Sequence, residues 1–439
     1  MTDNSEARTM RKIYWRLIPL LFLMVFINYL DRQNIGYAQL DMGKQVGITD
    51  AAFGFAGSVF YIGYMALQVP SNLGLHRIGA RRWIAGILLI WGVVAGATAL
   101  VTNDASLYAL RIALGAVEAG FLPGVAVYLT KWIPARRRAW AFGAYIIGGT
   151  VSGVVGGPVS TAIMTYANHL AGLRGWQWMF IFEGAAAIVL GLLALRLLTE
   201  RPSEAKWLAP EQRNWLESTL EAERAALGEP RRGRILSVIG DGRAWCLAVL
   251  FGCSLVGIYG WTLWLPQIVK SLGDLSDLQV GFLSAVPPLV GVVTTLIVSR
   301  SSDRTGDRKK HLGVVYGISA IAIAVSAYMP NHVVAYLLLC VAGLIYAGNP
   351  LFWSLASSFR AGATGAALIA FINMIAQFGG LVGPWSIGLI KGATNSFALA
   401  LVTIAAFLVV ATVIAFAMRV PATDAVGAET GRALAPGSR

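Results

Sequence analysis

Twelve apolar runs divide this chain, and most of them are close to the ~20 residues that a helix needs to cross a bilayer. Hydrophobic residues make up 56% of the chain, charged residues only 13%, and the mean hydropathy is +0.65. A soluble protein of this length carries far more charge. We therefore predict an all-α membrane protein with twelve transmembrane helices. The runs lie at 13–38, 52–73, 83–102, 107–130, 139–166, 176–198, 244–269, 279–299, 311–329, 333–358, 363–390 and 396–418.

The net charge of +13 is distributed unevenly between the two ends of these runs. Most of the 35 lysines and arginines fall in the terminal segments and in alternate loops, whereas the other loops hold only Lys44, Arg174, Lys270 and Lys391. This bias predicts a multi-pass protein of the bacterial inner membrane with both termini in the cytoplasm. The expected surroundings are therefore membrane lipid, and nucleic acid is not an expected partner.

One long hydrophilic segment separates the first six runs from the last six. Within it, Pro210 and Glu211 open a helix-permissive stretch of mixed charge, which predicts an amphipathic helix along the inner membrane surface. The expected domains are an N-terminal six-helix bundle at 1–198, the cytoplasmic linker at 199–243, a C-terminal bundle at 244–420 and a cytoplasmic tail at 421–439.

The sequence shows no spacing typical of a metal or cofactor site, and an enzyme is not expected. Its three cysteines fall inside predicted helices, so they indicate no disulfide framework. Its four histidines lie at or near predicted loop ends: His76, His169, His311 and His332.

The two halves of the chain repeat one another. Pro123 and Pro350 are separated by the same number of residues as Arg77 and Arg304, and Gly157 and Gly383 by one residue fewer. Three such spacings indicate a duplication of a six-helix unit, so the two bundles should be pseudo-symmetric.

Two charged residues, Arg111 and Glu118, lie inside the fourth run. Seven residues apart, they would share a helix face at roughly 10 Å along the axis. A charge in the hydrocarbon region costs about 2.5–3.5 kcal/mol on insertion scales, so it is usually kept where it faces a partner or a water-filled cavity. The pair predicts the wall of a polar pathway, and the alternative for either residue is a structural ion pair.

Two cation-rich loops follow the second and the eighth runs. They read GLHRIGARR at 74–82 and SDRTGDRKK at 302–310. With the repeat and the twelve runs, these loops resemble the signature loop of the major facilitator superfamily over essentially the whole chain, although His76 stands where that family usually has Asp. The resemblance implies loops whose charge contacts hold one access state, the alternative being loops that are merely cytoplasmic and basic. The implied gating residues are Arg77, Gly79, Arg81, Asp303, Arg304, Gly306 and Arg308.

Four further segments resemble the anion:cation symporter branch of that family. They lie at 28–35, 111–124, 175–178 and 259–266. Members of the branch carry organic anions such as sugar acids, tartrate, phthalate and hydroxyphenylacetate, typically with protons. The resemblance implies an organic-anion transporter and leaves the substrate open.

The residue chemistry agrees with that role. A guanidinium fork suits a carboxylate, so we expect Arg32, and less directly Arg111, to hold the substrate anion. A buried carboxylate can bind and release a proton, so Asp31 and Glu118 are the expected coupling residues. The alternative for Asp31 is that the first helix simply ends there.

The second half is uncharged at the corresponding positions, so we expect neutral contacts from it. The expected substrate-binding residues are Tyr64, Tyr259, Trp264, Trp353, Asn373 and Gln377, of which the resemblance implies Tyr64, Trp353 and Asn373. Each aromatic residue among them has a packing role as its alternative. The Gly-Pro pairs at 157–158 and 383–384 partly resemble a motif of drug exporters, but their presence in both halves favours close helix packing.

The resulting hypothesis is a proton-coupled symporter, acting as a monomer without a cofactor other than the proton. It would import an aromatic acid, a hydroxy dicarboxylate or a sugar acid by alternating access. The alternatives are an exchanger or uniporter without proton coupling, and a transport-like membrane receptor.

Overall fold

The computed structural model describes residues 3–227, 238–359 and 362–418, and every regular element in these ranges is a helix. The first half contains α1 (Asp3–Val46), α2 (Asp50–Ile78), α3 (Ala80–Ala97), α4 (Asp104–Glu118), α5 (Phe121–Thr130), α6 (Ala135–Tyr166) and α7 (Gly175–Leu197). The linker contains α8 (Pro210–Leu227). The second half contains α10 (Gly242–Lys270), α11 (Asp277–Thr305), α12 (Arg308–Ser326), α13 (His332–Ala342), α14 (Gly348–Ser357), α15 (Gly362–Ala376), α16 (Phe378–Thr394) and α17 (Ala398–Ala417). Short 3-10 turns are η1 (Thr98–Leu100), η2 (Leu170–Gly172), η3 (Pro202–Glu204) and η4 (Gly343–Ala347).

Eleven segments of the described chain are long and apolar enough to span a membrane. The segment that falls short is α12, the ninth of the twelve expected helices. Its first turn holds Arg308, Lys309 and Lys310, which lower its mean hydropathy although it packs between α13 and α17 like its neighbours. The all-helical membrane fold predicted from the sequence is confirmed.

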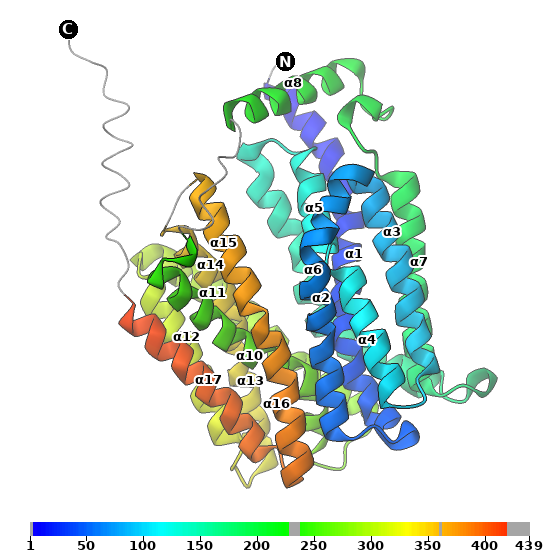
Figure 1. Cartoon of the computed structure of the whole chain (residues 1–439), viewed down its shortest axis with the longest axis vertical. Coiled ribbons are helices and arrows are strands. Elements are labelled where there is room, and N and C mark those ends of the chain that lie inside the picture. Colours follow the sequence, from blue (N-terminus) through cyan, green and yellow to red (C-terminus); the bar gives the residue numbers. More distant parts are fainter. Residues whose placement is uncertain (1–2, 228–237, 360–361, 419–439) are drawn as a thin grey trace.

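The first helix is much longer than its apolar run. α1 has 44 residues and continues past Asp31 to Val46, so Asp31 lies within the helix and not at its end. At 1.5 Å per residue it is roughly 66 Å long, more than the ~30 Å of a bilayer core. It is therefore long enough to extend beyond the bilayer core, and Figure 1 shows the start of α1 beside α8.

Three of the expected continuous helices are interrupted. The fourth breaks between α4 and α5, and the tenth breaks at η4, so the two interruptions are equivalent in the two halves. Each precedes a proline, Pro123 or Pro350, which has no N–H to donate to the carbonyl four residues earlier. The eleventh breaks at Gln377, between α15 and α16. The first of these breaks directly follows Glu118.

The linker helix α8 is anchored to the first half. The Glu223 carboxylate accepts the Ala135 N–H at 2.9 Å and pairs with Arg138 at 3.3 Å, which caps the start of α6. Between η3 and α8, the ring of Trp207 stacks on that of Trp132, with the ring centroids 5.5 Å apart. The predicted linker helix is therefore present, whereas the predicted tail at 421–439 lies outside the described residues.

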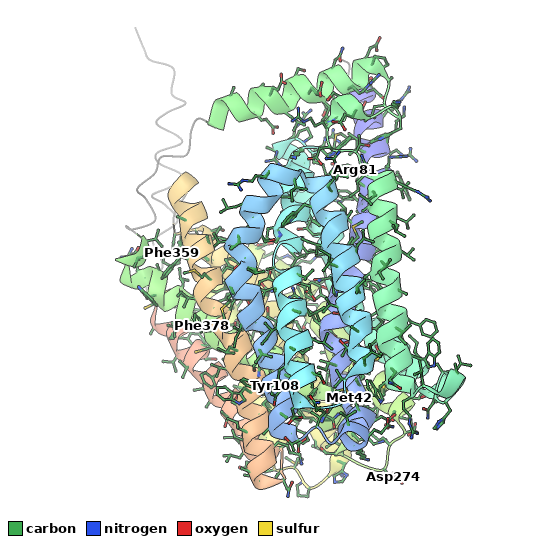
Figure 2. The ribbon with its side chains drawn as sticks, turned by 45° about the vertical axis from the view of Figure 1, so that its right-hand side comes forward. Met42, Arg81, Tyr108, Asp274, Phe359 and Phe378 are labelled. Carbon is green, nitrogen blue, oxygen red and sulfur yellow. The ribbon has the colours of Figure 1, made fainter. Side chains whose placement is uncertain are left out.

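The two halves meet at the end of the molecule opposite α8, which we call the far face. There, glycines bring backbones together: an added Cβ at Gly54 would lie 2.8 Å from the Gly388 Cα, and one at Gly157 would lie 2.5 Å from the Gly281 carbonyl oxygen. Toward the α8 face the ribbons of the two halves diverge (Figure 1). Figure 2 shows the two ends by their labelled residues, with Arg81 near the α8 face and Met42 and Asp274 near the far face.

Candidate functional site

A buried ion pair joins α1 to α4 within the first half. Arg32 Nε donates to Glu118 Oε2 at 2.8 Å, and Asn28 Nδ2 donates to the same oxygen at 2.7 Å. The Glu118 side chain is fully buried, whereas the Arg32 side chain is 14% exposed. The second carboxylate oxygen, Oε1, is buried and has no partner among the described residues. The pair thus combines a sealed carboxylate with a guanidinium that retains some access.

Aromatic rings surround the Arg32 guanidinium. Its central carbon lies 5.5 Å from the Tyr29 ring centroid and 5.3 Å from those of Phe60 and Tyr64. Cations are attracted to ring faces at such distances, and the attraction is larger where water is excluded. The expected substrate residue Tyr64 therefore lies beside Arg32.

The two halves approach each other next to this cluster. The ring of Tyr61, on α2, lies 4.8 Å from that of Tyr259, on α10. An added Cβ at Gly380, on α16, would lie 2.6 Å from the Tyr61 ring. Tyr259, one of the expected substrate residues, is thus among the second-half residues that border the Arg32 cluster.

Arg111 is buried and has no ion-pair partner in the described part of the chain. It makes no salt bridge to a described residue, and its Nε is buried with no acceptor. Its guanidinium carbon lies 5.0 Å from the Phe60 ring centroid, on the ring that also contacts Arg32. Because a guanidinium has five N–H donors, Arg111 retains capacity for an anion.

A second polar network surrounds Asp31. Trp91 Nε1 donates to Asp31 Oδ2 at 2.9 Å, and Asn34 Nδ2 donates to Asp31 Oδ1 at 3.2 Å. The same Asn34 nitrogen lies 2.6 Å from Oε2 of Glu183, on α7, whose Oε1 accepts from Ser160 at 3.0 Å. Glu183 is not among the residues expected from the sequence, although a lone carboxylate inside an apolar run is a usable signal.

The remaining second-half candidates have different surroundings. Trp264 is fully buried, donates to the Pro384 carbonyl at 3.1 Å and packs edge-on against Phe53 at 4.8 Å, which joins the halves near the far face. Trp353 packs against Phe251 at 5.0 Å. Asn373 is half-buried, and the nearby Gln377 is buried with an unpartnered Oε1.

The first gating loop is held by an acidic residue from beyond α7. The Glu200 carboxylate accepts the N–H groups of Ala80 at 2.9 Å and Arg81 at 2.8 Å, and Lys131 Nζ lies 2.6 Å from it. Partial burial raises the pKa of Glu200, but the hydrogen bonds from Lys131 and from the two backbone groups outweigh burial and lower the pKa overall. Gly79 supplies the turn with φ of 91°. The His76 side chain lies outside the described part of the structure.

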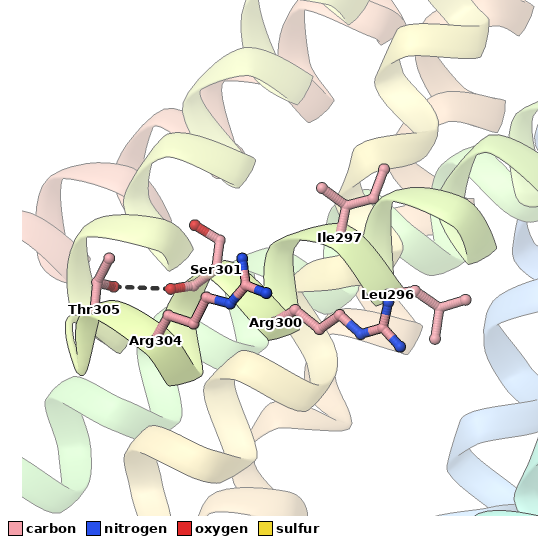
Figure 3. Close-up of a pocket in the computed structure, with 6 residues that line it drawn as sticks. All are labelled: Leu296, Ile297, Arg300, Ser301, Arg304 and Thr305. Carbon is pink, nitrogen blue, oxygen red and sulfur yellow. Dashed lines mark hydrogen bonds between the residues drawn. The ribbon is translucent and has the colours of Figure 1, made fainter.

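The second gating loop turns at Gly306, whose φ of 70° agrees with the turn expected there. Asp307 accepts the Lys310 N–H at 3.1 Å and caps α12, which begins at the predicted gating residue Arg308. A pocket of about 410 Å³ lies before this turn, lined by Arg300, Arg304 and four other residues of α11 (Figure 3). All six lining residues belong to one helix, so the pocket is an open hollow on the surface. The predicted gating residue Asp303 is not part of its lining.

Comparison with known proteins agrees with this architecture. Residues 21–384 match the family model of the Major Facilitator Superfamily. The chain is 41% identical to the "Putative tartrate transporter" of Agrobacterium vitis, over 94% of this chain and 95% of that protein. It is 38% identical to the "Quinolone resistance transporter" of Acinetobacter baumannii, over 90% and 91%.

Among solved structures, a bacterial homologue of the human lysosomal transporter Spinster, in an inward-facing and unoccupied conformation, has a similar fold. Its TM-score is 0.77 at 16% identity, covering 95% of this chain and 97% of that one. The match to the family model and the identity with its transporters lead to one conclusion: this chain is a multi-pass membrane transporter that belongs to the major facilitator superfamily.

Proposed function

We propose that this protein is a proton-coupled symporter that imports an organic carboxylate anion. The observation that supports it best is the buried pair between Arg32 and Glu118, in which one basic and one acidic group neutralise each other. Arg32 has partial access, so an incoming carboxylate can compete with Glu118 for its guanidinium.

The charge balance of this pair supplies the coupling. An anion on Arg32 leaves Glu118 as an uncompensated buried charge, which costs several kcal/mol. A proton on Glu118 removes that cost, and Oε1, buried and unpartnered, is the position for it. The empty pair and the fully loaded pair are then both neutral, whereas each half-loaded state has an unpaired charge in the membrane. Only the two neutral states reorient readily, which links anion movement to proton movement.

The substrate class follows from the cations. Arg111 and Arg32 both contact the Phe60 ring, so together they present two guanidinium groups to one region. Two carboxylates on a small molecule would satisfy both, and a second proton, with Asp31 as its expected carrier, would then keep the loaded site neutral. A hydroxy dicarboxylate is therefore the first candidate, and the name of the Agrobacterium vitis relative supports it. An aromatic acid or a sugar acid with a single carboxylate would bind only one of the two guanidinium groups, and the other would remain available to Asp31.

We place the α8 face in the cytoplasm of a bacterial inner membrane, following the distribution of positive charge. Contacts between the halves at the far face then close the outer side in this conformation. The gating loops lie at the cytoplasmic side, where closure would bring them toward the other half. A functional monomer suffices, since one chain supplies both halves.

The experiment is uptake into proteoliposomes of a panel of labelled acids: tartrate, a sugar acid and an aromatic acid. Each is tested with and without a proton gradient directed into the vesicle, for wild type and Glu118→Gln. We expect accumulation to require the gradient, and Glu118→Gln to retain exchange while losing uphill uptake. If the gradient changes the uptake of no transported acid, the protein is an exchanger or uniporter.

The relative from Acinetobacter baumannii suggests a second candidate, drug export. A quinolone included in the same panel separates the two. Gradient-driven loss of the quinolone from the side of the α8 face, with no transport of any organic acid, would replace import by export. Saturable binding of an acid without any flux would instead indicate a receptor.

A further inference from the structure

The proposed coupling does not use Glu183, although this carboxylate is one of the most completely enclosed in the protein. It is 4% exposed and lies between α1, α6 and α7. Asn34 Nδ2 donates to its Oε2 at 2.6 Å, and Ser160 Oγ lies 3.0 Å from its Oε1. No described cation forms an ion pair with it. An ionised carboxylate in such a place is costly, and the usual resolution is that the group takes up a proton.

The charged groups around Glu183 reinforce this. α1, α3, α6 and η1 pack most extensively against α7. The arginines of α3 and α6 lie in the first turns of these helices, at the α8 face. Along the helix axes they are about 15 Å or more from the residues that pack near Glu183. The short turn η1 contains no charged residue. The charged neighbour from α1 is Asp31, which is also negative and shares the Asn34 amide with Glu183. Two buried anions on one amide repel each other, so one of them is expected to be neutral.

The surroundings decide which of the two carries the proton. Asp31 accepts from the Trp91 N–H, which can only donate, as well as from Asn34, so both of its hydrogen bonds favour the ionised form. Glu183 has only Asn34 and a hydroxyl. A hydroxyl can reverse its role, so Ser160 Oγ can accept a hydrogen bond from a protonated Oε1 while Asn34 donates to Oε2.

A second observation is the Asn34 carbonyl oxygen. Asn34 is fully buried, and its Oδ1 has no partner among the described residues. Both N–H groups of the amide are directed to the two carboxylates, which leaves this acceptor free for a carboxylic acid O–H if the amide rotates. The network thus has an unused acceptor beside a carboxylate that forms no ion pair with a described residue.

We propose that Glu183 is a second proton-binding residue, protonated near neutral pH, and that transport fails when it ionises. The inference deepens the proposed symport but is tested without a proton gradient. In alkaline solution the loss of the Glu183 proton would place two negative charges on Asn34 and disturb the packing of α1 against α7.

The first test is infrared titration of purified protein in liposomes, without substrate. We expect the carbonyl band of a buried protonated carboxylic acid at neutral pH, its loss on alkaline titration, and its absence from Glu183→Gln. Glu118→Gln should retain it. A neutral-pH band of the same intensity in wild type and Glu183→Gln overturns the proposal.

The second test is tartrate counterflow with equal pH on both sides, for which no driving force from protons is needed. Wild type should lose exchange at alkaline pH, and Glu183→Gln, whose amide cannot ionise, should keep it to a pH higher by about one unit or more, a tenfold change in proton binding. The exposed Glu221→Gln on α8 is the matched control and should follow wild type. If wild type and Glu183→Gln lose exchange at the same alkaline pH, the proposal is contradicted. This outcome does not depend on whether a proton gradient drives uptake.

Ser160→Ala is a second variant for the infrared test, to be used if Glu183→Gln does not fold. Removing the hydroxyl acceptor destabilises the protonated acid, so the infrared band should disappear at lower pH than in wild type. If the band disappears at the same pH in Ser160→Ala as in wild type, or if the wild-type band does not titrate at all, the proposal is overturned.

Discussion

Arg32 on α1 and Glu118 on α4 are joined at 2.8 Å, although 86 residues separate them in the chain. Glu118 is sealed and Arg32 is not, so the pair is asymmetric: one partner is reachable by a substrate and the other is reachable only by a proton. This asymmetry supports the proposed anion–proton symport.

Breaking this pair from the Arg32 side should be strongly destabilising. Arg32→Ala leaves an unpaired buried carboxylate, and removing one partner of such a pair costs about 3–5 kcal/mol. The double variant Arg32→Ala with Glu118→Gln removes the stranded charge and should recover most of that loss. Thermal unfolding of the purified proteins in detergent measures both. Equal loss of stability in the single and double variants would show that the charges do not interact.

Arg111 separates a substrate role from a structural one. Since it has no ion-pair partner among the described residues, Arg111→Gln should leave the unfolding temperature nearly unchanged. Loss of a charge-assisted hydrogen bond worth about 1.5–3 kcal/mol should weaken anion binding by about 10- to 150-fold. Binding isotherms and unfolding curves of the same preparation provide the comparison. A large fall in stability with unchanged affinity would instead support the structural alternative.

Much of the fold was predictable from the sequence because hydrophobic run length and loop charge are local properties. The interior positions of Arg111 and Glu118 were equally readable. Partners were not: nothing in the sequence near Glu118 indicates Arg32 or Asn28, because a buried pair depends on how α1 and α4 are rotated against each other. The extension of α1 beyond its apolar run was also hidden, since polar residues such as Gln39 are buried there by neighbouring helices.

The break after Glu118 shows the same limit. Pro123 was visible, but a proline inside a membrane helix can be accommodated by neighbouring groups. Here Gly120 packs so closely against α2 that an added Cβ would overlap Ser71 Oγ, and this tertiary contact places the interruption. The pattern of residues along the sequence does not show which glycine packs against which neighbouring helix.

Glu200 predicts a pH-dependent contribution to stability at the first gating loop. Its folded-state pKa is lower than the ordinary value of 4.5, so the ionised form stabilises the fold. That stabilisation is complete above the ordinary value and disappears as pH falls through the lower folded-state value. Glu200→Gln should therefore cost about 1 kcal/mol near neutral pH, as loss of a helix cap does, and nothing in strong acid. Unfolding curves across pH test this, and a difference from wild type that persists at the lowest pH would refute it.

The glycine contacts at the far face offer a matched pair on one helix. Gly157→Ala in α6 would place a methyl group 2.5 Å from the Gly281 carbonyl oxygen and 2.6 Å from the Tyr37 hydroxyl, whereas Gly143→Ala in the same helix would meet nothing within 4 Å. Overpacking of this kind costs about 1–3 kcal/mol. The clash with Tyr37 lies within the first half, whereas the clash with Gly281 of α11 acts only when the halves are in contact at the far face. Gly157→Ala should therefore shift the population toward states open at that face. Spin labels at the exposed positions Lys44 and Thr394, in a cysteine-free background, report the separation of the halves. We expect longer distances for Gly157→Ala and the wild-type distribution for Gly143→Ala; identical distributions in both variants would mean that this contact does not control closure.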